Sequence, residues 1–122
     1  MARELGPEGH GVIVSQVVPF PWDSSVKVVA DYRAAERGFD PDFKPDFVSL
    51  EGYLSGRLVA AALEMVGPNP TRTEMLRVIN DVGRFNISGD ILTVGQKAHD
   101  APAKVFLTLI QPDGTFKAVD KL

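Results

Sequence analysis

The side chains able to do chemistry in this chain of 122 residues are few and far apart. His10 and His99 stand in separate glycine-rich or polar stretches, and no cysteine accompanies them, so the usual ligands of a zinc site are not gathered. Asp40, Asp42 and Asp46 carry oxygen ligands suited to calcium, but the stretch lacks the glycine and terminal glutamate of an EF-hand loop. We therefore expect a solvated loop there, with no metal and no other cofactor.

Nucleophilic catalysis and phosphate binding have no motif in the sequence. Ser88-Gly89-Asp90 lacks the surroundings of a nucleophile elbow, and neither histidine has an evident partner. Gly6, Gly9 and Gly11 precede an apolar run, whereas the glycines of a phosphate loop follow a strand. These observations predict a protein that is not an enzyme. A free-standing α+β domain with catalytic residues assembled from distant positions remains the open alternative.

Two segments carry side chains suited to holding a small ligand. The first is Ser49-Leu50-Glu51-Gly52, at the predicted start of an apolar helix, where unpaired backbone N–H groups attract a carboxylate. Ser49 adds a hydroxyl donor, and Glu51 suits an ammonium group. The alternative is structural: Ser49 caps the helix and Glu51 complements its dipole.

The second segment is Pro19-Phe20-Pro21-Trp22, in which prolines fix the backbone around two aromatic side chains. Such a rigid apolar surface can line a cleft or a hinge crossing. It can equally be packing around the beginning of a helix, and the sequence leaves both interpretations open.

Composition bounds the possible partners. The net charge is −3 and no basic patch is present, which argues against nucleic acid as a partner. The absence of cysteine excludes disulfide bonds, and no apolar run is long enough to span a bilayer. No apolar segment follows Met1 in the manner of a signal peptide, so we expect any export signal to lie upstream of this chain.

Hydrophobic periodicity and turn signals predict the elements that position these segments. The β-branched run Val12–Val18 is typical of a strand covered on both faces, as in a parallel sheet. Capping residues and apolar spacing predict three helices and then extended chain that ends in a hairpin around Gln111-Pro112-Asp113-Gly114. The ranges are a helix over 25–37 capped by Asp23 or Ser24 and stopped by Gly38, a main helix over 50–66, a short helix from a capping box at 71–74 to Gly83, extended chain over 85–94, a polar loop over 96–103, and hairpin strands over 105–110 and 115–119. The order predicts an α/β or α+β fold with helices covering one sheet.

The segments Gly11–Asp23 (GVIVSQVVPFPWD) and Pro45–Leu54 (PDFVSLEGYL), the latter running into the apolar helix Arg57–Val66, resemble the late part of the type I periplasmic binding proteins. These are the solute receptors of branched-chain amino acid ABC transporters. The resemblance extends from about Ala2 to Val119 and corresponds to the C-terminal third of a family member. It implies a partial type I periplasmic-binding-protein fold of class α/β, with residues 1–122 forming a single C-terminal fragment of a two-lobed protein.

The resemblance also implies function. Receptors of this kind close two lobes around a small solute and deliver it to an ABC permease in the periplasm, without bond chemistry. It places Phe47, Ser49, Leu50 and Glu51, with Phe20 and Trp22, at the edge of the ligand cleft, and Phe47 matches the aromatic that such receptors bring to the rim. The expected ligand is an amino acid or a related carboxylate. A cytoplasmic ligand-sensing regulator on the same fold is the alternative, and an upstream export signal would distinguish the two.

The strand Val12–Val18 raises a further expectation. It requires neighbours on both sides, yet the chain offers few candidates for a parallel sheet. Because an exposed apolar strand edge is a template for association, we expect the isolated chain to self-associate, as a two-fold dimer that completes its sheet or exchanges helices.

Overall fold

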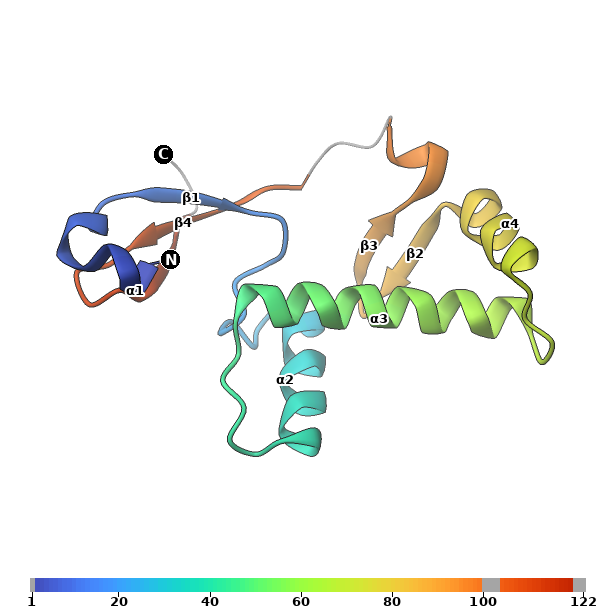
Figure 1. The fold of residues 1–122 in the computed structure, drawn as a ribbon, viewed down its shortest axis with the longest axis horizontal. Coiled ribbons are helices and arrows are strands. Elements are labelled where there is room, and N and C mark those ends of the chain that lie inside the picture. Colours follow the sequence, from blue (N-terminus) through green and yellow to red (C-terminus); the bar gives the residue numbers. More distant parts are fainter. Residues whose placement is uncertain (1, 100–103, 120–122) are drawn as a thin grey trace.

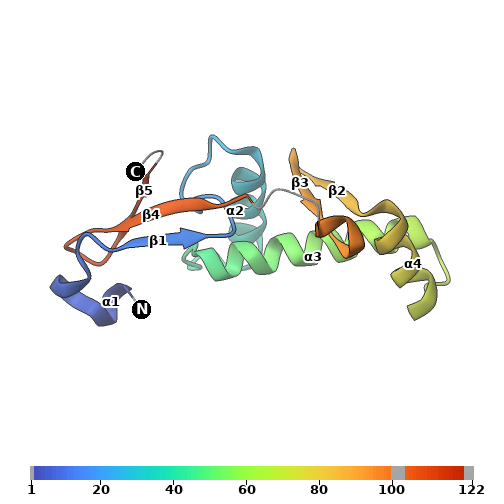
Figure 2. The same ribbon diagram turned by 90° about the horizontal axis from the view of Figure 1, so that it is seen from above.

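The computed structural model describes residues 2–99 and 104–119 and is elongated along α3 (Phe47–Val66) (Figure 1). A three-stranded sheet lies toward one end of the molecule. The helix α4 (Arg72–Val82) and a two-stranded sheet lie toward the other, and α2 (Lys27–Phe39) projects from the middle. The view from above in Figure 2 shows the same order along the molecule. The mixed α/β class predicted from the sequence is confirmed.

The three-stranded sheet has the order β1 (Ile13–Gln16), β4 (Phe106–Ile110), β5 (Phe116–Val119), and both pairings are antiparallel. The predicted C-terminal hairpin is confirmed as β4 and β5. The prediction that the first strand belongs to a parallel sheet is wrong, because its neighbour is the returning strand β4. Helices do not cover this sheet either: α1 (Ala2–Leu5) and the 3₁₀ helix η1 (Gly6–Gly9) lie at its end.

The helix α3 starts three residues earlier than the sequence predicted. Asp46 is its N-cap, with its side chain accepting the N–H of Ser49 at 2.7 Å, and the Ser49 hydroxyl in turn faces the Asp46 N–H at 3.3 Å. This reciprocal capping box moves the helix start from Leu50 to Phe47. The helix ends at Val66, as predicted, because Gly67 adopts a positive φ of 90°.

The helix α2 also differs from its prediction. It begins at Lys27 after Val26, which provides no side-chain cap, because the Asp23 carboxylate accepts the N–H of Ser25 at 3.0 Å within the preceding turn. It continues through Gly38 and ends at Phe39. Its buried residues are Val28, Val29 and Tyr32.

The second half of the chain follows the sequence signals closely. Thr71 caps α4 by accepting the Glu74 N–H at 3.1 Å, and Gly83 ends it in the left-handed conformation. The Glu74 carboxylate binds Arg77 instead of reaching back to the cap. The strands β2 (Arg84–Ile87) and β3 (Asp90–Thr93) then form a hairpin, and the 3₁₀ helix η2 (Gly95–Ala98) follows. The predicted loop over 96–103 lies partly outside the described residues.

The hydrophobic core joins α2, α3, α4 and the β2–β3 hairpin. Its buried members are Val18, Val28, Val29, Tyr32, Leu50, Leu54, Ala62, Val78, Phe85 and Ile87. Several other apolar side chains of α3 and α4 are exposed, among them Val59, Leu63, Met65 and Leu76. None of the helices in the described part of the chain has the length and apolarity needed to cross a membrane.

Candidate functional site

Three of the aromatic residues singled out from the sequence meet at the start of α3. The ring centroid of Phe47 lies 6.1 Å from that of Phe20 and 5.6 Å from that of Trp22, and the Phe20 and Trp22 rings are 4.9 Å apart. Pro21, between them, is fully buried and fixes the loop. Trp22 keeps 40% of its surface exposed. The structure thus forms an aromatic cluster with one open side.

A fourth member, Phe116, was not found from the sequence. Its ring centroid lies 5.4 Å from that of Phe47 in an edge-to-face contact. Phe116 begins β5, nearly seventy positions along the chain from Phe47, and no spacing signal links the two. The contact joins the three-stranded sheet to α3. The aromatic cluster (Phe20, Trp22, Phe47 and Phe116) therefore lies where this sheet meets the start of α3.

The backbone at the start of α3 is already occupied by its own residues. The Ser49 N–H donates to the Asp46 carboxylate, and the Leu50 N–H donates to the Asp46 carbonyl at 3.2 Å. These two amides are therefore not free to bind a ligand's carboxylate, contrary to the expectation for Ser49-Leu50-Glu51-Gly52. The negative charge of Asp46 also complements the helix dipole at the position where a bound anion would do so.

Ser49 and Leu50 lie behind this surface. The Ser49 hydroxyl lies 2.5 Å from the hydroxyl of the buried Tyr32, which also accepts the Asp46 N–H at 3.2 Å. Leu50 has no exposed surface and belongs to the core. Leu50 therefore lines no open surface, whereas the half-buried Ser49 holds the start of α3 through Asp46 and Tyr32.

A half-buried carboxylate, that of Glu36, lies beside this hydroxyl pair. Burial raises the pKa of Glu36, and its Oε2 atom is buried without a hydrogen-bond partner among the described residues. Burial also raises the pKa of Tyr32 to about 12, so its hydroxyl remains protonated at neutral pH. The Tyr32 hydroxyl supports the loop before α3 through its hydrogen bond to the Asp46 N–H.

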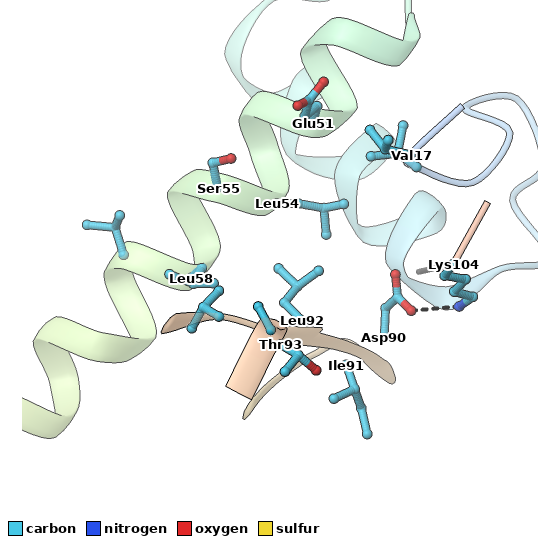
Figure 3. Close-up of a pocket in the computed structure, with 14 residues that line it drawn as sticks. Val17, Glu51, Leu54, Ser55, Leu58, Asp90, Ile91, Leu92, Thr93 and Lys104 are labelled. Carbon is cyan, nitrogen blue, oxygen red and sulfur yellow. Dashed lines mark hydrogen bonds and ion pairs between the residues drawn. The ribbon is translucent and has the colours of Figure 1, made fainter. Parts of the chain in front are cut away.

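Glu51 lines a pocket of about 590 Å³ between α3 and β3 (Figure 3). Leu54 and Leu58 of α3 and Leu92 of β3 form much of its apolar wall, and Val17 closes one side. Glu51 itself is exposed and forms no ion pair within the described part of the chain. The sequence identified Glu51, but the pocket depends on the position of the β2–β3 hairpin and was not predicted.

The far side of the pocket holds a second carboxylate that already has a partner. Asp90 on β3 forms an ion pair with Lys104 at 2.8 Å, and Figure 3 shows the pair at the edge opposite Glu51. Its charge is therefore compensated, whereas that of Glu51 is not. A pocket with an apolar wall and one uncompensated carboxylate suits a ligand that combines an apolar body with a cationic group.

The described residues contain no cluster of three or more metal-ligating side chains. The site therefore consists of two neighbouring features, the aromatic cluster and the Glu51 pocket, both supported by the first turns of α3. Aromatic faces, an apolar wall and a carboxylate provide binding groups and contain no nucleophile paired with a base.

Comparison with known proteins gives matches among solved structures. The chain is similar to a possible leucine/isoleucine/valine-binding protein from Rhodopirellula baltica SH 1, with 36% sequence identity and a TM-score of 0.81 over 96% of this chain. It is also similar to an extracellular ligand-binding receptor from Verminephrobacter eiseniae, with 27% identity and a TM-score of 0.72 over 89% of this chain. No protein-family model matches the sequence, and no curated protein matches it either.

A third match, to a substrate-binding periplasmic protein from Ralstonia solanacearum, has 22% identity, a TM-score of 0.73 and 90% coverage of this chain, and shows likeness of fold alone. The chain spans only 31%, 31% and 32% of the lengths of these three proteins. The resemblance to the type I periplasmic binding proteins is confirmed: this chain has the fold of part of such a binding protein. All three neighbours are described as binding proteins, not as enzymes.

Proposed function

We propose that this chain is the C-terminal third of a periplasmic receptor that binds an amino acid or a related carboxylic acid for an ABC importer. The observation that carries the proposal is the match to the Rhodopirellula baltica protein, which extends over 96% of the chain and about a third of that protein. A piece of this size is expected to hold one edge of a cleft between lobes. The many exposed apolar side chains fit a chain that packs against further protein.

The aromatic cluster and Glu51 supply the binding groups of this edge. Trp22 and Phe47 lie beside the junction of the sheet and α3, so a solute between two lobes would meet their exposed faces. Glu51, four residues after Phe47 on the same helix, has a free carboxylate suited to the ligand's ammonium group. Phe20 supports Trp22 from within the loop, and Ser49 and Leu50 hold the helix start in place.

The receptor performs binding and hand-off without bond chemistry. In such a protein, ligand affinity that is greater in the closed state drives closure of the lobes, and the closed form is delivered to the permease. The ligand's carboxylate would be held mostly by the two thirds that this chain does not contain, because the Ser49 and Leu50 amides are already occupied.

A chimera tests the proposal. The segment of the Rhodopirellula baltica protein that this chain matches is replaced by residues 1–122, and the chimera and the chain alone are heated with increasing concentrations of amino acids. A ligand that binds only the native state stabilises the protein in proportion to the logarithm of the ligand concentration. The melting temperature of the chimera should therefore rise steadily as the amino-acid concentration is increased. The chain alone should not respond. A folded chimera without any ligand response would refute receptor function, and a saturable response of the chain alone would refute an incomplete cleft.

A further inference from the structure

The side chain of Arg33 on α2 ties down the loop that carries Trp22 (residues 19–24, the Trp22 loop). Its Nη1 donates to the Ser24 hydroxyl at 3.0 Å and to the Trp22 carbonyl at 3.4 Å. In the described part of the chain, all other hydrogen bonds of this loop come from residues 20–26, within the loop or directly after it. Arg33 therefore provides the polar attachment of the Trp22 loop to another element.

The preceding residue of α2, Tyr32, holds the other aromatic segment. Its buried hydroxyl accepts the Asp46 N–H at 3.2 Å and lies 2.5 Å from the Ser49 hydroxyl. Phe47 follows Asp46 directly and begins α3. Because consecutive residues of a helix project about 100° apart, two neighbouring side chains of α2 reach two different segments. Phe47 is thus fixed from α2, as Trp22 is.

The two attachments determine how Trp22 and Phe47 lie against each other. Their ring centroids are 5.6 Å apart in an edge-to-face contact, and Trp22 keeps 40% of its surface exposed. We propose that Arg33 is a positioning residue for side-chain selectivity, because it fixes Trp22 against Phe47 at the cleft edge. The proposal rests on the proposed function, in which the side chain of the solute meets these two rings.

The hydrogen bonds of Arg33 suit positioning better than direct binding of a ligand. Nη1 already has two acceptors inside the protein, and the residue is half-buried. An arginine holds its donors in a rigid planar fork, whereas the ammonium group of a lysine turns on a flexible stem. Hydrogen bonds from a charged donor are also stronger than those between neutral groups. Arg33 can therefore fix the Trp22 loop more firmly than a neutral or flexible side chain would.

Fluorescence of the chain alone tests the positioning, because Trp22 is its only tryptophan. Arg33→Met removes the donors and keeps an apolar stem, so the Trp22 emission should shift to longer wavelength and acrylamide should quench it more strongly. The matched control is Arg37→Met, which removes the same charge one turn further along α2, at an exposed residue without a side-chain hydrogen bond among the described residues. This control should leave both signals unchanged. Equal signals from the parent and Arg33→Met would overturn the proposal.

Ligand selectivity in the chimera distinguishes positioning from a merely structural role. Calorimetry compares leucine with alanine, whose side chain is too small to extend far between the two rings. Arg33→Met should lower the leucine-to-alanine affinity ratio about threefold to tenfold, the scale of one net hydrogen bond. Equal weakening of both amino acids would overturn the proposal, since loss of stability or of a direct carboxylate contact acts on both. A parent chimera that binds neither would refute the proposed function and the selectivity with it, whereas the fluorescence test does not depend on binding.

Ser24→Ala provides a milder change of the same contact. It removes one of the two acceptors and leaves the guanidinium in place, so the affinity ratio should fall by less than in Arg33→Met. In the Arg33→Met background Ser24→Ala should have no further effect, because the two substitutions remove one shared interaction. Arg33→Lys keeps the charge without the planar fork and should restore only part of the ratio. Additive effects of Ser24→Ala and Arg33→Met would overturn the action of Arg33 through the Trp22 loop.

Discussion

Truncation of Phe47 should destabilise this chain more than truncation of Val48, its exposed neighbour on the same turn. Loss of a fully buried phenylalanine side chain costs about 3–5 kcal/mol, and Phe47 is partly buried, so we expect Phe47→Ala to lower the free energy of unfolding by about 2–3 kcal/mol. Much of this arises from the contacts of its ring with Phe20, Trp22 and Phe116, at centroid distances of 6.1, 5.6 and 5.4 Å. Edge-to-face pairs of this kind add about 0.5–1.5 kcal/mol each to the burial of apolar area.

Urea unfolding followed by circular dichroism measures this difference, with Val48→Ala as the matched control. Val48 is 77% exposed on the same helical turn, so its truncation should change the free energy of unfolding by less than about 0.5 kcal/mol. Equal effects of the two substitutions would refute the role of the aromatic cluster in joining the sheet to α3. In the chimera, Phe47→Ala should also weaken amino-acid binding by about 1–3 kcal/mol, and unchanged affinity would make Phe47 a packing residue only.

Three further predictions concern the carboxylates around α3. Because burial raises the folded-state pKa of Glu36, the stability it contributes is complete below its ordinary pKa of 4.5 and is lost as the pH rises through the raised value. Glu36→Gln should therefore be more stable than the parent at pH 7, and the difference should vanish in acid. Urea unfolding across this pH range measures it, and a lower free energy of unfolding for the variant at pH 7 would contradict the burial argument. Asp46→Ala removes the cap of α3 and should lower the free energy of unfolding by about 1–2 kcal/mol, whereas an unchanged unfolding midpoint would show that Ser49 caps the helix alone. Glu51→Gln in the chimera should weaken leucine binding about tenfold and leave the binding of an analogue without the amino group unchanged, and equal losses for both in calorimetry would exclude the ammonium contact.

Local signals in the sequence predicted the elements whose ends depend on local chemistry. Thr71 and Gly83 bound α4, Gly67 ends α3, and the turn before Thr115 forms the C-terminal hairpin. In each case a side chain or a glycine satisfies the helix or turn within a few residues, so no distant contact is needed to fix the boundary.

Predictions failed where a local choice depended on distant structure. Asp46 and Ser49 can each cap α3, and the hydroxyl of Tyr32 from another helix helps to hold the Asp46 arrangement. A β-branched run such as Val12–Val18 indicates a strand but not the direction of its neighbour, so the antiparallel partner β4 could not be inferred.

The candidate site was predicted only in part, because some of its contacts also depend on residues that are distant in the sequence. Phe20 and Trp22 were found from their residue types and the prolines beside them, Phe47 was found through the family resemblance, and the structure brings the three rings together. Phe116 completes the cluster only through the packing of β5 against α3, which no sequence spacing encodes. Leu50 was selected because it stands in the stretch Ser49–Gly52 at the predicted helix start, and the helical geometry turns its side chain into the core.

The most direct test of the account is a crystal structure of the chimera with leucine bound. We expect the ligand to lie between two lobes, with Phe47 or Trp22 in contact with its side chain and Glu51 near its ammonium group. A ligand held entirely by the Rhodopirellula baltica part, with the aromatic cluster and the Glu51 pocket filled by protein, would contradict the assignment of a cleft edge to this chain.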